Sequence, residues 1–360
     1  MPSKDRTTVL INATTFHDIV SGRRRDPIAI ALRLVFALIE LPYRVAVAVR
    51  NRRFDRQKLS VTRVDAPVIS VGNLTLGGTG KTPVVAWLAR WFRDRDIRVS
   101  IISRGYGSND SGQNDEAREL EARLPDVPHL QNPDRVAAAT VAIEELETEL
   151  ILLDDGFQHR RLHRDLNILL VDATEPFGHD RVFPRGTLRE PLQSSRRADV
   201  IAVTKCEAIS SDRLDEIDRR FHSIAPNAVY VRLKQLPTNL ITCSGIAESI
   251  ELLRGKRVAA FCGIGNPDSF RTTLQTLGAD LVAFREFPDH HKFKRSDIQS
   301  ISECLLGANI DLCICTHKDL VKLNVDRIAS VPLYALQIQL EIASGQELFE
   351  QRLQEIADRI

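Results

Sequence analysis

The chain has 360 residues, of which 43% are hydrophobic and 27% are charged, so disordered, fibrous and collagen-like classes are excluded and two globular domains are possible. Its 49 basic and 48 acidic side chains leave a net charge of +1, which provides no overall field for nucleic acid, and we expect no nucleic-acid partner. Six cysteines without a C-x-x-C pair indicate buried thiols in a reducing compartment.

The first 60 residues contain an apolar segment between two arginine clusters. The segment Pro27–Val49 is interrupted by Arg33, Glu40 and Arg44, so no run is long enough to cross a bilayer. A helix on an anionic membrane surface fits this pattern, and so does a helix packed on the protein's own core and bent at Pro42. Residues 1–26 show no signal peptide, so we expect a cytosolic protein. The flanking arginines are Arg23, Arg24, Arg25, Arg50, Arg52, Arg53 and Arg56.

From Ala66 onward, short β-branched runs alternate with helical segments, which is typical of βαβ units around a parallel sheet. We expect two α/β lobes with a junction between Pro226 and Gly255, where turn residues gather. The expected divisions are 1–60, 61–235 and 236–360. The predicted strands are Val68–Val71, Val99–Ser103, Leu150–Leu153, Leu166–Val171, Val200–Thr204, Arg257–Cys262, Leu281–Phe284, Leu312–Cys315 and Leu333–Ile338. The predicted helices are Lys81–Asp94, Arg135–Glu147, Asp212–His222, Asp268–Leu277, Ser296–Leu306 and Gly345–Asp358.

A glycine-rich loop follows the first predicted strand and precedes an amphipathic helix. The segment Gly72–Pro83 reads GNLTLGGTGKTP, although Thr75 replaces the usual first glycine of a phosphate loop. Backbone N–H groups and a helix N-terminus can hold phosphate oxygens, while Lys81 suits phosphate charge and the Thr82 hydroxyl suits Mg²⁺. The sequence therefore predicts a nucleotide-phosphate site formed by Gly77, Gly78, Thr79, Gly80, Lys81 and Thr82.

Two carboxylates, Asp154 and Asp155, follow the apolar strand predicted at 150–153. One could hold Mg²⁺ and the other could orient a reacting group. A solvated strand end is the alternative. Their position downstream of the phosphate loop favours a Mg²⁺ site with Thr82, Asp154 and Asp155 as ligands.

Phosphoryl transfer also needs positive charge and a proton acceptor. Four further segments could supply them, although each is also compatible with an ordinary surface loop. These segments are Ser103–Gly107, Asp115–Glu116, Arg185–Pro191 and Phe287–His291.

Six segments, in this order, closely resemble the tetraacyldisaccharide 4′-kinase family of lipid A biosynthesis: GNLTLGGTGKTP, SRGYG, DDGFQHRRLHRD, LREP, FPDHH and THKD. The resemblance runs from Leu41 to Leu323. It implies a P-loop NTPase-type parallel sheet with a second, smaller α/β lobe and an N-terminal apolar helix. It also implies an ATP- and Mg²⁺-dependent kinase that phosphorylates the 4′-hydroxyl of a tetraacylated glucosamine disaccharide 1-phosphate. Such an enzyme is peripheral on the cytoplasmic face of the inner membrane, docked on its anionic surface by the apolar helix.

The resemblance also suggests residue roles. The family's catalytic aspartate maps to Asp115 as general base, although the segment Asn114–Ala117 lacks the glycine and proline that usually flank it. Its histidine partner maps to His290, and His291 is the neighbour. Lys81 and Asp155 complete the expected catalytic set. The expected substrate-binding residues are Asn73, Arg135, Gln158, Arg189 and Glu190. The stretch 177–185 also departs from the pattern G-N-G-x-L-L-P of many relatives.

Two other functions remain as alternatives. A membrane-associated nucleotide switch of the partition-ATPase or GTPase type is disfavoured, because Leu76 stands where the partition loop has its signature lysine. The segment Thr204–Glu207 also reads TKCE rather than N-K-x-D. A kinase for a soluble metabolite is disfavoured by the apolar segment Pro27–Val49. Oligomeric state, acyl-chain preference and nucleotide selectivity are not predicted.

Overall fold

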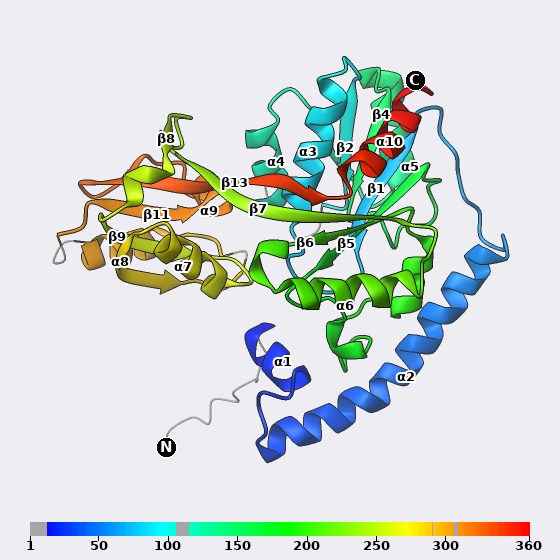
Figure 1. Ribbon diagram of the computed structural model, residues 1–360, viewed down its shortest axis with the longest axis horizontal. Coiled ribbons are helices and arrows are strands. Elements are labelled where there is room, and N and C mark those ends of the chain that lie inside the picture. Colours follow the sequence, from blue (N-terminus) through cyan, green and yellow to red (C-terminus); the bar gives the residue numbers. More distant parts are fainter. Residues whose placement is uncertain (1–12, 106–114, 290, 306–308) are drawn as a thin grey trace, which may run out of the picture.

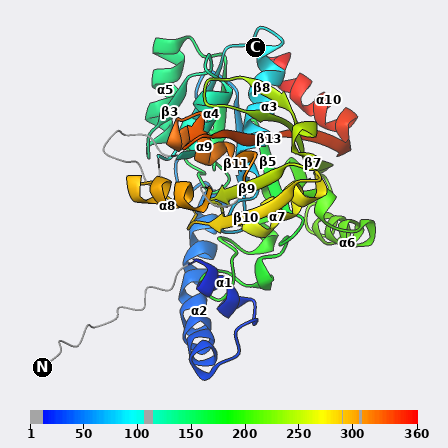
Figure 2. The same ribbon diagram turned by 90° about the vertical axis from the view of Figure 1, so that its left-hand side faces the viewer.

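The computed structural model describes residues 13–105, 115–289, 291–305 and 309–360. Within these residues, one continuous sheet of 13 strands runs through two lobes, and helices cover both of its faces (Figure 1). A long N-terminal helix projects from the first lobe (Figures 1 and 2).

The first lobe is built on parallel strands in the order β6-β5-β1-β4-β2-β3. Its strands are β1 (Val68–Asn73), β2 (Val99–Ser103), β3 (His129–Gln131), β4 (Leu150–Asp154), β5 (Leu166–Asp172) and β6 (Val200–Thr204). Its helices are α3 (Lys81–Arg93), α4 (Asp115–Arg123), α5 (Arg135–Leu146) and α6 (Ser211–His222), with short 3-10 turns at Gly178–Asp180, Leu192–Arg197 and Cys206–Ala208.

The second lobe continues the sheet in the order β10-β9-β11-β13, also with parallel pairing. Its strands are β8 (Ala247–Ser249), β9 (Arg257–Cys262), β10 (Asp280–Glu286), β11 (Leu312–Thr316), β12 (Arg327–Ile328) and β13 (Val331–Ser344). Its helices are α7 (Pro267–Thr276), α8 (Arg295–Leu305) and α9 (His317–Leu323), with a 3-10 turn at Ile250–Leu253.

Two long antiparallel strands join the lobes. Strand β7 (Val229–Ile241) pairs with β6 at its beginning and with β13 along most of its length. The expected junction of turns between Pro226 and Gly255 is therefore largely a strand. Pro237 lies at an irregularity in the pairing with β13, where its missing N–H disturbs the ladder little. The division between residues 235 and 236, which stays a prediction, falls inside β7.

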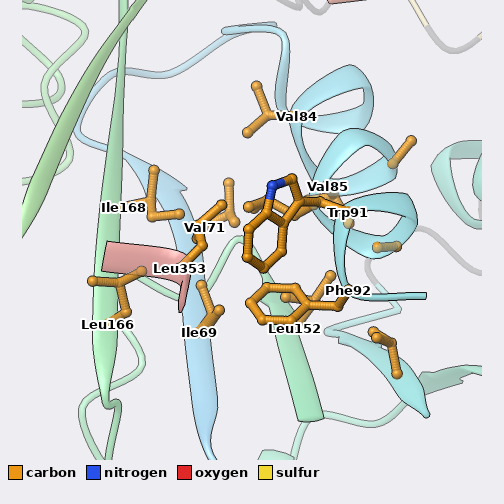
Figure 3. Packing of buried hydrophobic residues seen from close by; sticks show 14 of the residues in the cluster. Ile69, Val71, Val84, Val85, Trp91, Phe92, Leu152, Leu166, Ile168 and Leu353 are labelled. Carbon is orange, nitrogen blue, oxygen red and sulfur yellow. The ribbon is translucent and has the colours of Figure 1, made fainter. Parts of the chain in front are cut away.

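The C-terminal helix α10 (Gln346–Ala357) returns to the first lobe. Its Phe349 stacks on Trp87 of α3 with ring centroids 5.7 Å apart, and Leu353 is fully buried in the same core. Helix α3 carries apolar residues at a helical spacing that faces the sheet, and Figure 3 shows its side chains against those of β1, β4 and β5. This packing holds the loop between β1 and α3. The residues labelled in Figure 3 are Ile69, Val71, Val84, Val85, Trp91, Phe92, Leu152, Leu166, Ile168 and Leu353.

The N-terminal region consists of α1 (Ala13–Val20) and α2 (Pro27–Asp55). The carboxylate of Asp26 caps α2 by accepting a hydrogen bond from the Ala29 N–H at 3.2 Å, and the helix continues through Pro42. No helix in the described part of the chain combines the length and apolar character needed to cross a bilayer.

Candidate active site

Buried polar side chains gather at one edge of the first lobe. They stand at the carboxyl ends of adjacent parallel strands, which is the edge where α/β sheets bind ligands. The phosphate loop leaves the sheet at the same edge, between β1 and α3. The four buried side chains that end β1, β4, β5 and β6 are Asn73, Asp154, Asp172 and Thr204.

The phosphate loop is fixed from two sides. Gly80 caps α3 in the left-handed conformation, with φ = 77°. This positive φ favours glycine, and a Cβ here would also lie 2.0 Å from Nε2 of Gln235, whose side chain would have to move. From the other side, Thr204 Oγ1 donates to the carbonyl of Thr79 at 2.9 Å, and Lys205 Nζ donates to the carbonyl of Gly78 at 2.9 Å. The loop is therefore preorganised by its neighbours.

Lys205 and Asp172 were not identified as site residues from the sequence. Lys205 Nζ lies 2.5 Å from Asp172 Oδ2 and so joins the end of β5 to the phosphate loop. The sequence signal for Lys205 is the Thr-Lys pair at the end of β6, which we compared only with a GTPase motif. Lys205 thus supports the phosphate loop directly, and Asp172 supports it through Lys205.

Asp155 lies at the centre of a charged cluster. Lys81 Nζ is 3.8 Å from its Oδ1, and Nη1 of Arg189 lies 2.9 Å and 2.8 Å from its two carboxylate oxygens. Burial alone raises the pKa of Asp155, but the positive charges of Lys81 and Arg189 and the hydrogen bonds from Arg189 lower it below its ordinary value. Asp155 is consequently held as a carboxylate beside the phosphate loop.

Arg135 begins α5 and is only 4% exposed. Burial and the neighbouring Arg104 charge lower the pKa of its guanidinium, while Asp155 and Asp154 act in the opposite direction. Arg135 therefore belongs to the same electrostatic environment as the two carboxylates.

The oxygen donors at this edge fit Mg²⁺. Asp154 is buried at the end of β4, Asp155 follows it directly, and Thr82 is the second residue of α3, which starts at the phosphate loop. Carboxylate and hydroxyl oxygens are the ligands that Mg²⁺ prefers.

Two predicted substrate residues shape the loop. Gln158 Nε2 donates to the carbonyl of Asn73 at 2.8 Å, and Asn73 Nδ2 donates to the carbonyl of Thr75 at 2.8 Å. Asn73 is fully buried. The side-chain amides of Asn73 and Gln158 thus connect the segment after β4 with the start of the phosphate loop, and their substrate contacts stay predictions.

The side chain of Glu190 is buried. Its carboxylate lies 2.8 Å from Arg197 Nη2 and accepts a hydrogen bond from Asn51 Nδ2 of α2 at 3.0 Å. Burial raises the pKa of Glu190, but the Arg197 charge and the hydrogen bonds from Arg197 and Asn51 lower it below its ordinary value. In this structure the carboxylate attaches the end of α2 to the loop that carries Arg189.

The predicted dyad falls largely outside the described residues. Asp115 begins α4, but its side chain and all of His290 lie outside them, so their pairing stays a prediction. Tyr106, Gly107 and Asn114 of the other predicted segments lie outside as well. Helix α4 nevertheless contacts the second lobe.

Glu119 of α4 lies 3.7 Å from Nδ1 of His317 in α9. The helix that begins with Asp115 is therefore in direct contact with the second lobe. His291, the neighbour of the predicted histidine, has its Nε2 2.9 Å from Oδ2 of Asp297 and stacks on Phe287 at 4.7 Å. Lys318 of α9 has its Nζ 2.9 Å from Oδ1 of Asp289, so the segment after β10 contacts α9.

Comparison with known proteins identifies the family. The chain matches the model of the tetraacyldisaccharide-1-P 4′-kinase family over residues 32–358. It is 36% identical over 349 residues to tetraacyldisaccharide 4′-kinase of Anaeromyxobacter sp. (strain K), covering 92% of each chain. It is also 36% identical over 355 residues to that of Syntrophus aciditrophicus (strain SB), covering 91% of this chain and 94% of the relative.

A solved structure agrees with this match. The crystal structure of LpxK from Aquifex aeolicus in complex with ATP superposes with a TM-score of 0.72 at 30% identity, over 90% of this chain and 99% of that chain. The family match, the two curated relatives and this structure point to the same conclusion. The chain belongs to the tetraacyldisaccharide-1-P 4′-kinase family.

Proposed function

We propose that this lipid A 4′-kinase transfers the γ-phosphate of ATP, with Mg²⁺, to the 4′-hydroxyl of a tetraacylated glucosamine disaccharide 1-phosphate. The observation that carries this proposal is the cluster of Lys81, Asp155 and Arg189 beside a phosphate loop, in a chain of this family. The ATP in the crystal structure of the Aquifex aeolicus relative supports the choice of nucleotide.

Each group of residues at the site has a separate role in phosphoryl transfer. Backbone N–H groups of Gly77–Gly80 and the N-terminus of α3 bind phosphate oxygens, and Lys81 neutralises their charge. Thr82, Asp154 and Asp155 hold Mg²⁺, which when bound neutralises charge on the transferred phosphoryl group. Arg135 and Arg189 add positive charge to the same centre and so favour its transition state.

Asp115 accepts the proton of the sugar. The 4′-oxygen attacks the γ-phosphorus, the bond from this phosphorus to the β,γ-bridging oxygen breaks, and ADP leaves. The hydroxyl proton moves to Asp115, whose proton affinity is raised by His290. Because Asp115 begins α4 and α4 contacts α9, a movement of the second lobe would shift the helix that carries this base.

Helix α2 docks the enzyme on the cytoplasmic face of the inner membrane. One side of the helix is held by the protein through Glu40, Tyr43 and Asn51. At about 100° per residue, the exposed apolar side chains fall on the opposite side. An exposed apolar face near clustered arginines is suited to an anionic lipid surface. The exposed apolar residues of α2 are Ile28, Ile30, Leu34, Val35, Leu38, Ile39, Leu41, Val45 and Val49.

The membrane helix is also connected to the phosphate site. Tyr43 Oη donates to the carbonyl of Arg189 at 2.9 Å, and Arg50 Nη2 donates to the carbonyl of Gln158 at 2.6 Å. These bonds fix the distance between the lipid surface and the loop that carries Arg189. A substrate whose acyl chains remain in the membrane can thereby present its sugar to the phosphate loop.

The nucleotide-switch alternative is not favoured, because the family and the curated relatives are lipid kinases. One assay separates the three functions. Purified protein is incubated with γ-labelled ATP and either the disaccharide lipid in mixed micelles, a soluble glucosamine sugar, or buffer. We expect label in the lipid alone. Label in the soluble sugar would indicate a metabolite kinase, and release of inorganic phosphate without labelled lipid would indicate a switch.

A further inference from the structure

We infer that His17, Glu175 and His179 form a binding site for a divalent transition-metal ion, with Zn²⁺ as the best match. One ligand atom from each of the three side chains lies within 4.8 Å of the other two. Nε2 of His17 is 2.6 Å from one oxygen of Glu175, and Nε2 of His179 is 3.3 Å from the other. This cluster is separate from the phosphate site and does not depend on the proposed function.

The backbone at His179 supports a specific role for its side chain. His179 has φ = 59°, and it lies between Gly178 and Asp180, which also have positive φ values of 53° and 60°. Non-glycine residues adopt this conformation at an energetic cost, which persists only where the surrounding structure enforces it. Here the left-handed turn brings the His179 imidazole back to Glu175, four residues earlier.

The His179 nitrogen is a ligand atom without its own hydrogen bond. Its Nε2 is shielded from solvent and makes no hydrogen bond within the described ranges, although Glu175 is near enough for an ionic contact. A buried polar atom of this kind normally has a partner. A metal ion between the imidazoles and the carboxylate supplies one.

The donor set selects the metal. Two neutral imidazoles and one carboxylate suit Zn²⁺ and its neighbours in the transition series, whereas Mg²⁺ prefers oxygen ligands alone. The side chains of His17, Glu175 and His179 are 35%, 29% and 26% exposed, so water can reach a fourth coordination position. The site is thus three-coordinate from the protein with one open position.

Glu175 also has an outer hydrogen bond that orients it. Thr187 Oγ1 donates to Glu175 Oε1 at 2.7 Å. Such outer contacts fix the orientation of metal ligands and raise metal affinity. The carbonyl of Thr187 in turn accepts the N–H of Leu76 in the phosphate loop at 2.7 Å. The proposed site is therefore linked to the phosphate loop through one residue.

The metal would hold α1 against the first lobe. His17 belongs to α1, whereas Glu175 and His179 belong to the segment after β5 (Figure 1). Other contacts also hold α1: the ring of Phe16 lies 5.9 Å from Phe36 of α2 and 5.8 Å from Phe183, and Arg33 Nη1 donates to the Ile19 carbonyl at 3.5 Å. A metal bond across this contact would fix α1, and with it the beginning of α2, relative to the loop that carries Arg189.

The test measures metal binding rather than activity. Full-length protein without a histidine tag is stripped with a chelator and titrated with Zn²⁺ in excess Mg²⁺ and ADP, which occupy the phosphate site. Titration with Co²⁺ then reports coordination by nitrogen through its visible absorption. The variants are His179→Asn, which retains a residue tolerant of positive φ, and Glu175→Gln, which retains the volume. His222→Asn, at an exposed position, is the matched control.

We expect about one Zn²⁺ per chain and a loss of affinity of roughly tenfold or more in His179→Asn and Glu175→Gln, with His222→Asn like the native chain. We also expect the Tm of the native chain, but not of His179→Asn, to rise with Zn²⁺. Absence of stoichiometric binding, or equal affinity in all variants, would mean that the cluster is a hydrogen-bonded ion pair only. Because the phosphate site is occupied throughout, this result is independent of kinase activity.

Discussion

Arg189 Nη1 lies within hydrogen-bond distance of both carboxylate oxygens of Asp155, at 2.9 Å and 2.8 Å, and Lys81 Nζ approaches one of these oxygens at 3.8 Å. Arg189 is on the loop that contacts α2, whereas Asp155 follows strand β4. The pair therefore connects the loop beside α2 to the segment that follows β4. The negative charge of Asp155 in this pair is the basis of the first prediction.

Replacing Asp155 by Asn should lower kcat by about a hundredfold or more, equivalent to about 3 kcal/mol of transition-state stabilisation. The carboxylate charge is lost while the volume remains. Because its positive neighbours lower the pKa of Asp155, the native side chain is ionised at neutral pH. Steady-state rates at saturating Mg²⁺ measure the effect, with Asp65→Asn, on an exposed segment before β1, as control. Near-native turnover of Asp155→Asn would remove it from the site.

Polar substitutions on the exposed face of α2 should release the enzyme from anionic vesicles. In Leu34→Gln/Leu38→Gln/Leu41→Gln, three side chains that are 65%, 76% and 66% exposed lose their apolar character without loss of core packing. Co-sedimentation with vesicles measures binding, and KM for the lipid substrate should rise while KM for ATP stays unchanged.

A matched triple variant tests whether replacing any three exposed apolar side chains, outside α2, changes vesicle binding. It carries Val61→Gln, Ile246→Gln and Leu348→Gln. This control should sediment with vesicles like the native chain. Equal binding by the α2 variant and the native chain would show that this face does not contact lipid.

Glu190→Gln should destabilise the fold by roughly 3 kcal/mol at neutral pH, because it leaves the buried Arg197 without its counter-charge. The pKa of Glu190 is lowered in the folded state, so its stabilising effect is complete above the ordinary value of 4.5. The effect is lost as the pH falls through the lowered folded-state pKa. The free energies of unfolding of the native protein and of Glu190→Gln, measured in urea from neutral pH to well below pH 4.5, should therefore become similar at acidic pH.

The exposed pair of Arg213 and Glu216 provides the control for this measurement. Glu216→Gln should change the free energy of unfolding by less than about 1 kcal/mol, because exposed ion pairs contribute little. If Glu190→Gln were no more destabilising than Glu216→Gln, the attachment of α2 through Glu190 would be energetically unimportant.

Asp115→Ala and His290→Ala should each lower kcat with little change in KM for ATP. If the two residues act as one unit, the double variant should fall little below the slower single variant. Single-turnover rates of the four proteins give this comparison. Additive losses would indicate independent roles, and a fully active Asp115→Ala would transfer the role of base to Asp154 or Asp155.

The first lobe was predictable because its signals are local. A β-branched run, a glycine-rich loop and an amphipathic helix follow one another in Val68–Arg93, and the structure confirms strand, loop and helix in that order. The P-loop type of fold and the kinase family are confirmed as well. Strand β7 was missed because Pro237 resembled a turn signal and because its partner β13 is about a hundred residues away in sequence.

The site was predictable in its residue types and less so in its pairings. Asp155 and Arg189 were both identified, but they are 34 positions apart in sequence, and their contact depends on the fold of the chain between them. The LREP segment predicted that Glu190 binds substrate, whereas its carboxylate in this structure contacts Arg197 and Asn51. Such contacts are set by which loops meet in space, and no sequence spacing encodes them directly.

In the proposed reaction the phosphate loop delivers a phosphoryl group to the sugar 4′-hydroxyl. Proton–phosphorus correlation NMR of the purified lipid product tests it most directly. We expect a new phosphomonoester coupled to the 4′ proton, an unchanged 1-phosphate, and no such product from Lys81→Ala. A phosphate on another hydroxyl, or product formation by Lys81→Ala at the native rate, would contradict it.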